Sequence, residues 1–276
     1  MSADVNRRVL PGFGLSLGYA SAYMSVLILI PIAAVLLKSS TLSWADFVDA
    51  VWTDRARAAY ALTLGASFVA ALVNVPFGVL IAWVLVRYSF PGRRILDAII
   101  DLPFALPTAV AGLVYSSLYV KKGWLGQYLV PLGIEGAYSR LAIVLVLTFI
   151  GLPFIVRAVQ PVLAELEAEV EEAAACLGAT RWQTFWRVLI PTLLPATVTG
   201  FALAFARGIG EYGSVVFVSG NMPFKTEIAP VLVVASLESF HYADAAAIAV
   251  VMLAMSFSLL VAINLLERWT KRHGYT

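Results

Sequence analysis

Long runs without any charged side chain recur along this sequence of 276 residues. Six such runs are bounded by Arg8 and Lys38, Arg57 and Arg87, Asp101 and Lys121, Arg140 and Arg157, Arg187 and Arg207, and Asp244 and Glu267. A helix needs about 20 mainly apolar residues to cross roughly 30 Å of hydrocarbon, and most of these runs approach or exceed that length. The pattern predicts an all-α, polytopic membrane protein with six transmembrane helices, at about residues 12–37, 60–86, 98–119, 139–160, 192–219 and 243–266.

The composition agrees with a location in the lipid bilayer and excludes several functions. Hydrophobic residues make up 61% of the chain and charged residues 13%. The cations are scattered between apolar runs and form no basic face, so we expect no nucleic-acid partner. The single cysteine, Cys176, excludes a disulfide within the chain, and with two histidines no multi-Cys or multi-His metal site can form. We therefore expect no metal. An intramembrane hydrolase would need a Ser/His, paired-Asp or His-metal constellation within the membrane, and both histidines lie outside the spans, so we expect no catalytic residue and no cofactor in this chain.

The distribution of Lys and Arg predicts the orientation in the membrane. Eleven of these residues fall on the side that holds both termini and the segment before the fifth span, and seven on the other side. Cytoplasmic loops of membrane proteins carry the excess of positive charge. We therefore expect both termini to be cytoplasmic.

Some segments depart from a simple span. The fourth run is short, and we expect Arg157 to snorkel at its end. The fifth must extend through Arg207 and Glu211 to about Ser219. Residues 228–237 are too few to cross a bilayer, so we place them in a loop as an interfacial or re-entrant piece.

Two prolines, Pro103 and Pro107, mark an irregular start to the third span. We find no internal repeat of 20 to 50 residues and no Gly/Ser-rich or Pro-rich linker. The sequence therefore predicts a single membrane domain at residues 1–276.

A polar insert separates the fourth and fifth spans. Residues 163–177 favour a helix, because Glu, Ala, Leu and Val dominate there. Gly178 then stands where a helix end requires a left-handed residue. Thr180 and Gln183 form a T-x-x-Q capping box, which predicts a second helix through Arg187. The insert is thus expected to fold as helix, sharp elbow and helix.

The side chains of the insert indicate a contact surface. Trp182 and Trp186 are four residues apart and should face one side of the second helix. Residues 173–175 are all alanine and lie beside Gly178, so another protein can approach the backbone closely. The alternative is an interfacial hairpin without a partner, anchored at the headgroups by its tryptophans.

The run Glu172-Ala173-Ala174, three residues, Gly178, nine residues and then Val188-Leu189-Ile190-Pro191 resembles the EAA signature of ATP-binding-cassette (ABC) importer permeases, E-A-A-x3-G-x9-I-x-L-P. It departs conservatively, with Val188 and Ile190 in the places of Ile and Leu. The resemblance implies a type I importer transmembrane domain whose cytoplasmic loop, at about 163–191, holds a coupling helix that inserts into a cleft of an ATPase subunit. The residues that it assigns to this contact are Glu172, Ala173, Ala174, Leu177, Gly178, Ala179 and Thr180.

A nucleotide-binding motif is missing from the sequence, and this indicates what kind of partner the loop contacts. No G-x-x-x-x-G-K-[ST] sequence occurs in the chain, so it cannot hold nucleotide phosphates by that route. We expect the ATPase, with its ATP and Mg²⁺, to be a separate subunit, and this chain to be no enzyme.

A charged pair lies in the fifth span. Arg207 and Glu211 are one helical turn apart and can neutralise each other. Charges at mid-membrane are costly, by about 2.5 to 3.5 kcal/mol on insertion scales, and are functional candidates by default. Arg207 would supply positive potential to an anion pathway or gate, with Glu211 tuning it and Tyr212 and Ser214 offering hydroxyls. The alternative is a structural ion pair that keeps two helices or subunits in register.

The same segment refines the family. The stretch ARGIGEYGSVVFVSGNMP and the last span resemble T-type permeases of sulfate/thiosulfate importers, within the sulfate/molybdate permease group. The resemblance implies a bacterial inner-membrane complex with a second, W-type permease, two copies of the ATPase and an external sulfate/thiosulfate-binding protein. A molybdate/tungstate permease is the alternative within the group. An ATP-independent secondary anion carrier or channel is the alternative from another class.

Overall fold

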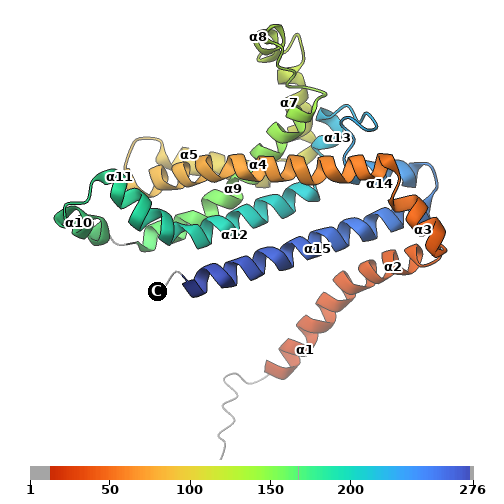
Figure 1. The fold of residues 1–276 in the computed structure, drawn as a ribbon, viewed down its shortest axis with the longest axis horizontal. Helices are drawn as coiled ribbons and strands as arrows, with labels where there is room; N and C mark the ends of the chain where they lie inside the picture. Colours follow the sequence, from red (N-terminus) through yellow and green to blue (C-terminus); the bar gives the residue numbers. More distant parts are fainter. Residues whose placement is uncertain (1–12, 167, 274–276) are drawn as a thin grey trace, which may run out of the picture.

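A computed structural model describes residues 13–166 and 168–273, and every regular element in this part of the chain is helical. The elements are α1 (Phe13–Met24), η1 (Ser25–Leu29), α2 (Ile30–Ser39), α3 (Trp44–Val51), α4 (Asp54–Arg87), α5 (Arg93–Ile100), α6 (Leu102–Ala105), α7 (Thr108–Tyr119), α8 (Gly126–Leu129), η2 (Val130–Leu132), α9 (Arg140–Glu165), α10 (Ala168–Cys176), α11 (Arg181–Thr184), η3 (Phe185–Leu189), α12 (Ile190–Ile209), α13 (Val215–Val218), α14 (Ala229–Glu238) and α15 (Tyr242–His273). Helices α4, α9, α12 and α15 run along the long axis of the molecule, whereas α7 and α8 leave the bundle sideways (Figure 1). The predicted all-α class is confirmed.

Helices α4, α9 and α12 form the centre of the bundle because glycines let them approach closely. A Cβ on Gly78 of α4 would stand 2.6 Å from the side chain of Ile155 on α9. A Cβ on Gly200 of α12 would stand 2.8 Å from the Cα of the same residue. Small residues at such contacts are typical of helices that associate in a bilayer, where dispersion contacts replace the hydrophobic effect.

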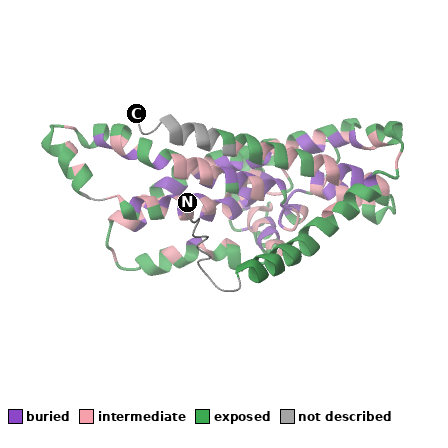
Figure 2. Ribbon diagram, turned by 90° about the horizontal axis from the view of Figure 1, so that it is seen from below, coloured by how far each residue is buried: buried purple, intermediate pink, exposed green. Residues whose placement is uncertain are grey.

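Burial divides the helices into a core and a periphery. Buried residues concentrate where α4, α9 and α12 meet (Figure 2). By contrast, none of the most apolar stretch of the first possible span, Phe13–Ser39, is buried against the rest of the described chain. Its apolar side chains therefore face lipid or another protein.

Five helices in the described part of the chain are long and apolar enough to cross a membrane: Phe13–Ser39, Asp54–Arg87, Arg140–Glu165, Arg181–Ile209 and Tyr242–Ile263. The sixth predicted span, at 98–119, is not one helix, since α5, α6 and α7 divide that segment, and the irregular start predicted from Pro103 and Pro107 is confirmed. One break falls at Asp101, and the other at Leu106, which is extended as a residue before proline tends to be. The segment placed in a loop at 228–237 is the short helix α14.

The predicted extension of the fifth span to Ser219 is also wrong. Helix α12 ends at Ile209, and α13 starts separately at Val215. The break lets α7 pack on α13, because Gly112 of α7 lies directly against the backbone of Ser214. A side chain at Gly112 would force these two elements apart.

At its other end the fifth span starts earlier than predicted. Helices α11, η3 and α12 form one continuous helix from Arg181 to Ile209. The π-helical turn η3 stands just before Pro191, as η1 stands just before Pro31. Proline lacks an N–H and clashes with the carbonyl four residues earlier, and a π turn is one way in which a helix absorbs that defect. The second helix of the polar insert therefore joins the span without a break.

Candidate functional site

The polar insert folds as helix, elbow and helix, as predicted. Its first helix, however, is not continuous over 163–177. Helix α9 ends at Glu165, Leu166 is extended, and α10 begins at Ala168. Glu167 lies outside the described residues. We call residues 168–189, which comprise α10, the elbow, α11 and η3, the elbow loop.

The elbow is a Schellman motif. The amide of Ala179 donates to the carbonyl of Ala174 at 3.0 Å, and that of Gly178 donates to the carbonyl of Ala175 at 2.9 Å. Gly178 has a φ of +83°, in the left-handed region that glycine adopts without steric cost. These bonds satisfy carbonyls at the end of α10 and fix the direction in which the chain leaves it.

The predicted capping box starts the second helix. The backbone amide of Gln183 donates to the Thr180 hydroxyl at 3.3 Å. The backbone amide of Thr180 donates to the side-chain oxygen of Gln183 at 2.8 Å. Trp182 and Trp186 share one side of this helix, with ring centroids 5.6 Å apart. Phe185 packs against both. Local sequence signals therefore predicted this half of the loop correctly.

The residues assigned to an ATPase contact lie together around the elbow. Leu177, a large apolar side chain, is 89% exposed. Exposed with it are Glu172, Ala173, Gly178 and Thr180, whereas Ala174 and Ala179 are half-buried. The tip of the elbow loop thus presents one large apolar side chain among small ones.

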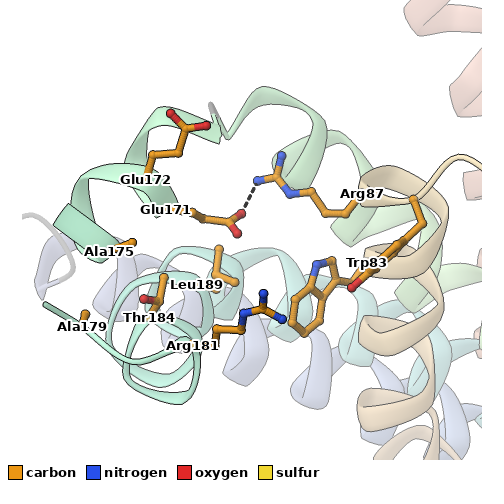
Figure 3. A pocket seen from close by; sticks show the side chains of 10 residues that line it. Trp83, Arg87, Glu171, Glu172, Ala175, Ala179, Arg181, Thr184 and Leu189 are labelled. Atoms are coloured by element: carbon orange, nitrogen blue, oxygen red, sulfur yellow. Dashed lines mark ion pairs between the residues drawn. The ribbon is translucent and has the colours of Figure 1, made fainter.

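A contact that sequence reasoning missed ties the elbow loop to the bundle. Arg87, the last residue of α4, places Nη2 2.8 Å from Glu171 Oε1 on α10 (Figure 3). The same nitrogen donates to the carbonyl of Leu166 at 3.1 Å. Among the described residues Glu171 Oε1 has no hydrogen-bond partner, so the tie has the geometry of an ion pair. No sequence signal pairs charges from segments so far apart.

A cleft of about 710 Å³ lies between the elbow loop and the end of α4. Its lining residues are Trp83, Arg87, Tyr88, Glu171, Glu172, Ala175, Ala179, Arg181, Thr184 and Leu189 (Figure 3). Beside it, Trp83 of α4 stacks on Phe185 of η3 with ring centroids 5.2 Å apart. The loop therefore meets α4 through an ion pair and a ring stack, with open space next to them.

The predicted intramembrane pair is present. Arg207 Nη1 lies 2.5 Å from Glu211 Oε2. The carboxylate is buried, with 2% of its side chain exposed, while 35% of the Arg207 side chain is exposed. Glu211 is not in the same helix, because α12 ends at Ile209. The pair thus joins the end of α12 to the turn that follows it.

The two hydroxyls named from sequence have different surroundings. Ser214 donates both its amide and its hydroxyl to Glu211 Oε1, each at 2.9 Å. Tyr212 instead packs against the buried cluster of α4, α9 and α13. The structure therefore brings Arg207, Glu211 and Ser214 together and leaves Tyr212 outside this group.

The expectation that Arg157 snorkels at the end of its span is wrong. Its guanidinium lies 2.7 Å from Asp97 and 2.5 Å from Asp101. Gln160 accepts a further hydrogen bond at 2.5 Å. The hydrogen bond from Arg157 lowers the pKa of the Asp97 carboxyl on α5. This network fixes α5 against α9, and the sequence gives no sign of it because the carboxylates come from another segment.

The bundle of apolar helices with an exposed elbow at one end is that of a polytopic membrane protein. The model of the family described as binding-protein-dependent transport system inner membrane component matches residues 74–272, and the chain belongs to that family. It is similar to the sulfate transport system permease protein CysT of Escherichia coli, at 48% identity over 97% of this chain and 96% of the relative. It is also similar to the probable sulfate transport system permease protein of Nephroselmis olivacea, at 53% identity over 89% of this chain and 86% of the relative.

A solved structure agrees with the fold. The chain resembles a subunit of a bacterial alginate ABC transporter in complex with a pentasaccharide-bound periplasmic protein, with a TM-score of 0.76 and 18% identity. The match covers 93% of this chain and 94% of that one. At this identity it establishes the architecture of an ABC importer transmembrane domain and nothing about cargo.

Proposed function

We propose that this chain is the T-type permease subunit of an ATP-driven importer of sulfate or thiosulfate, and that it forms half of the translocation pathway. The observation that carries the proposal is identity of about half of all positions, over nearly the whole chain, to permeases named for sulfate transport. The chain is a permease component and not itself an ATPase. Within the same group, molybdate or tungstate is the alternative cargo.

The elbow loop is the contact for the ATPase in this proposal. Its tip offers Leu177, which finds no packing within the subunit, beside a backbone that alanines and Gly178 leave accessible. An apolar side chain among small ones suits a complementary groove, because the partner can reach the main chain. Glu172 is exposed at the rim of the cleft and stays available for a cation of the partner (Figure 3). ATP and Mg²⁺ would bind to two ATPase copies, and ATP-driven closure would move the elbow loop.

The remaining partners take other surfaces. The exposed apolar span Phe13–Ser39 suits contact with lipid and with a second, W-type permease. An external binding protein would dock on the outer loops, near residues 44–57 and 123–138. This arrangement places both termini and the elbow loop on the cytoplasmic side of the bacterial inner membrane, in agreement with the excess of positive charge there.

Arg207 is the proposed anion-facing residue. Its side chain is 35% exposed, while Glu211, with which it pairs, and Ser214 are buried. An arginine near the end of a membrane-spanning helix raises the local potential for an oxyanion, and a buried carboxylate limits how tightly the anion would bind. Tyr212 plays no part in this site, because its ring packs against the core.

Transport by the reconstituted complex tests the proposal. This chain would be purified with the ATPase, the second permease and the binding protein, and uptake of labelled sulfate into vesicles measured with and without ATP. We expect ATP-dependent uptake that unlabelled sulfate or thiosulfate competes more strongly than molybdate. Stronger competition by molybdate would assign the cargo to the alternative. Uptake driven by an ion gradient, with no copurifying ATPase, would identify a secondary carrier instead.

A further inference from the structure

Two adjacent carboxylates on α10 line the same cleft but differ in their contacts. Glu171 points toward Arg87 and pairs with it (Figure 3), whereas Glu172 is exposed and forms no ion pair with another described residue. The side chains of Glu171 and Arg87 are 31% and 20% exposed, so water screens their attraction only in part. Only Glu172 belongs to the EAA signature, and the function proposed above gives Glu171 no role.

Arg87 holds three elements with one guanidinium. It is the final residue of α4, it donates to the carbonyl of Leu166 just after α9, and it pairs with Glu171 on α10. Helix α4 in turn packs along α9 and α12 through the centre of the bundle. A displacement of α10 therefore reaches a core helix directly at this residue.

The surroundings of the tie leave room for the loop to move. The cleft separates α10 from the end of α4, and near it the ring stack of Trp83 and Phe185 is a second contact between the loop and α4. An ion pair without hydrogen-bond geometry has no strict direction, and its attraction persists as the partners shift. A ring stack likewise tolerates sliding. Such contacts allow the elbow loop to move while it stays attached to α4.

We propose that Arg87 is a positioning residue for transport, which transmits displacement of the elbow loop to α4 through Glu171. This inference rests on the function proposed above, in which the ATPase moves the elbow loop. In it Glu172 serves the partner subunit and Glu171 serves the bundle. Loss of the tie then leaves ATP hydrolysis and docking intact but separates them from transport.

The test measures how much sulfate is imported per ATP hydrolysed by the reconstituted complex. The variants are Arg87→Gln, Glu171→Gln and the exchange Arg87→Glu with Glu171→Arg. Arg94→Gln is the matched control, because it removes an exposed positive charge at the same end of the bundle. We expect each single variant to copurify with the ATPase, to keep its hydrolysis rate and to lose about tenfold in uptake per ATP, within the usual range of coupling between sites.

The exchange should recover most of the ratio, and Arg94→Gln should match the parent chain. The inference is overturned if both single variants keep the parent ratio, or if they lose thermal stability alone. It is overturned also if the exchange performs no better than either single variant. If Arg87→Gln does not assemble, Glu171→Gln decides, because it leaves the bond from Arg87 to Leu166 in place. Failure of the parent complex to import sulfate would refute the proposed function instead.

Discussion

Replacement of Gly178 by aspartate tests whether the elbow meets another protein. Gly178 has a φ of +83°, and a Cβ built there would find no atom of this chain within 4 Å. Within the subunit the change therefore costs only the left-handed backbone, about 1 to 2 kcal/mol for a residue with a side chain. Any larger loss of function must come from a partner that occupies the empty space. We expect Gly178→Asp to abolish ATPase copurification and uptake.

Gly92 supplies a matched control for that experiment. Its φ is +87°, and a Cβ there also finds nothing within 4 Å. Gly92→Asp should therefore lower the melting temperature of this chain about as much as Gly178→Asp does. Unlike Gly178→Asp, it should leave assembly and uptake in place. Thermal unfolding and pull-down of the ATPase measure the two effects separately. If Gly178→Asp assembles and transports as well as Gly92→Asp does, the elbow is not the docking element.

Further predictions concern the intramembrane pair and the helix contacts. Arg207→Ala leaves a buried carboxylate without its cation, at a cost of about 3 to 5 kcal/mol, so it should reduce stability and uptake more than its combination with Glu211→Ala. Equal melting temperatures of the single and double variants would contradict this coupling. Gly200→Ala drives a Cβ to 2.8 Å from the backbone of α9 and should lower the yield of folded complex severely. Gly65→Ala has open space and should stabilise α4 by about 1 kcal/mol, and equal effects of the two would contradict the packing argument.

Hydropathy predicted most spans because each depends on its own residues. It did not predict the break at Asp101, a charged residue that the expected third span at 98–119 included. In the structure Arg157 pairs with that carboxylate from α9, so Asp101 can stand at a break inside the protein. The predicted extension of the fifth span to Ser219 was also wrong because of a contact that the sequence pattern does not show. Glu211 accepts hydrogen bonds from Ser214 in a turn, which a reading of one-turn spacing along a continuous helix did not anticipate.

The elbow loop shows the same limit. Gly178 and the box of Thr180 and Gln183 were predictable because each motif is completed within a few residues. The tie between Arg87 and Glu171 was not, because it joins segments that only the folded bundle brings together. Of two consecutive glutamates, the motif marks the one that does not pair with Arg87. Sequence patterns thus predicted the form of the elbow, but not the contact that holds it to the bundle.

The two interpretations of Arg207 and Glu211 turn out to be compatible. The two oxygens of Glu211 are divided, since Oε2 faces Arg207 and Oε1 accepts both donors of Ser214. The carboxylate therefore fixes the turn between α12 and α13 whatever else the pair does. Arginine has five N–H donors, the pair with Glu211 is made through Nη1, and 35% of the Arg207 side chain is exposed. In this pair Glu211 is buried and Arg207 is partly exposed. Arg207 can therefore attract an oxyanion while Glu211 keeps its cation and its bonds to Ser214.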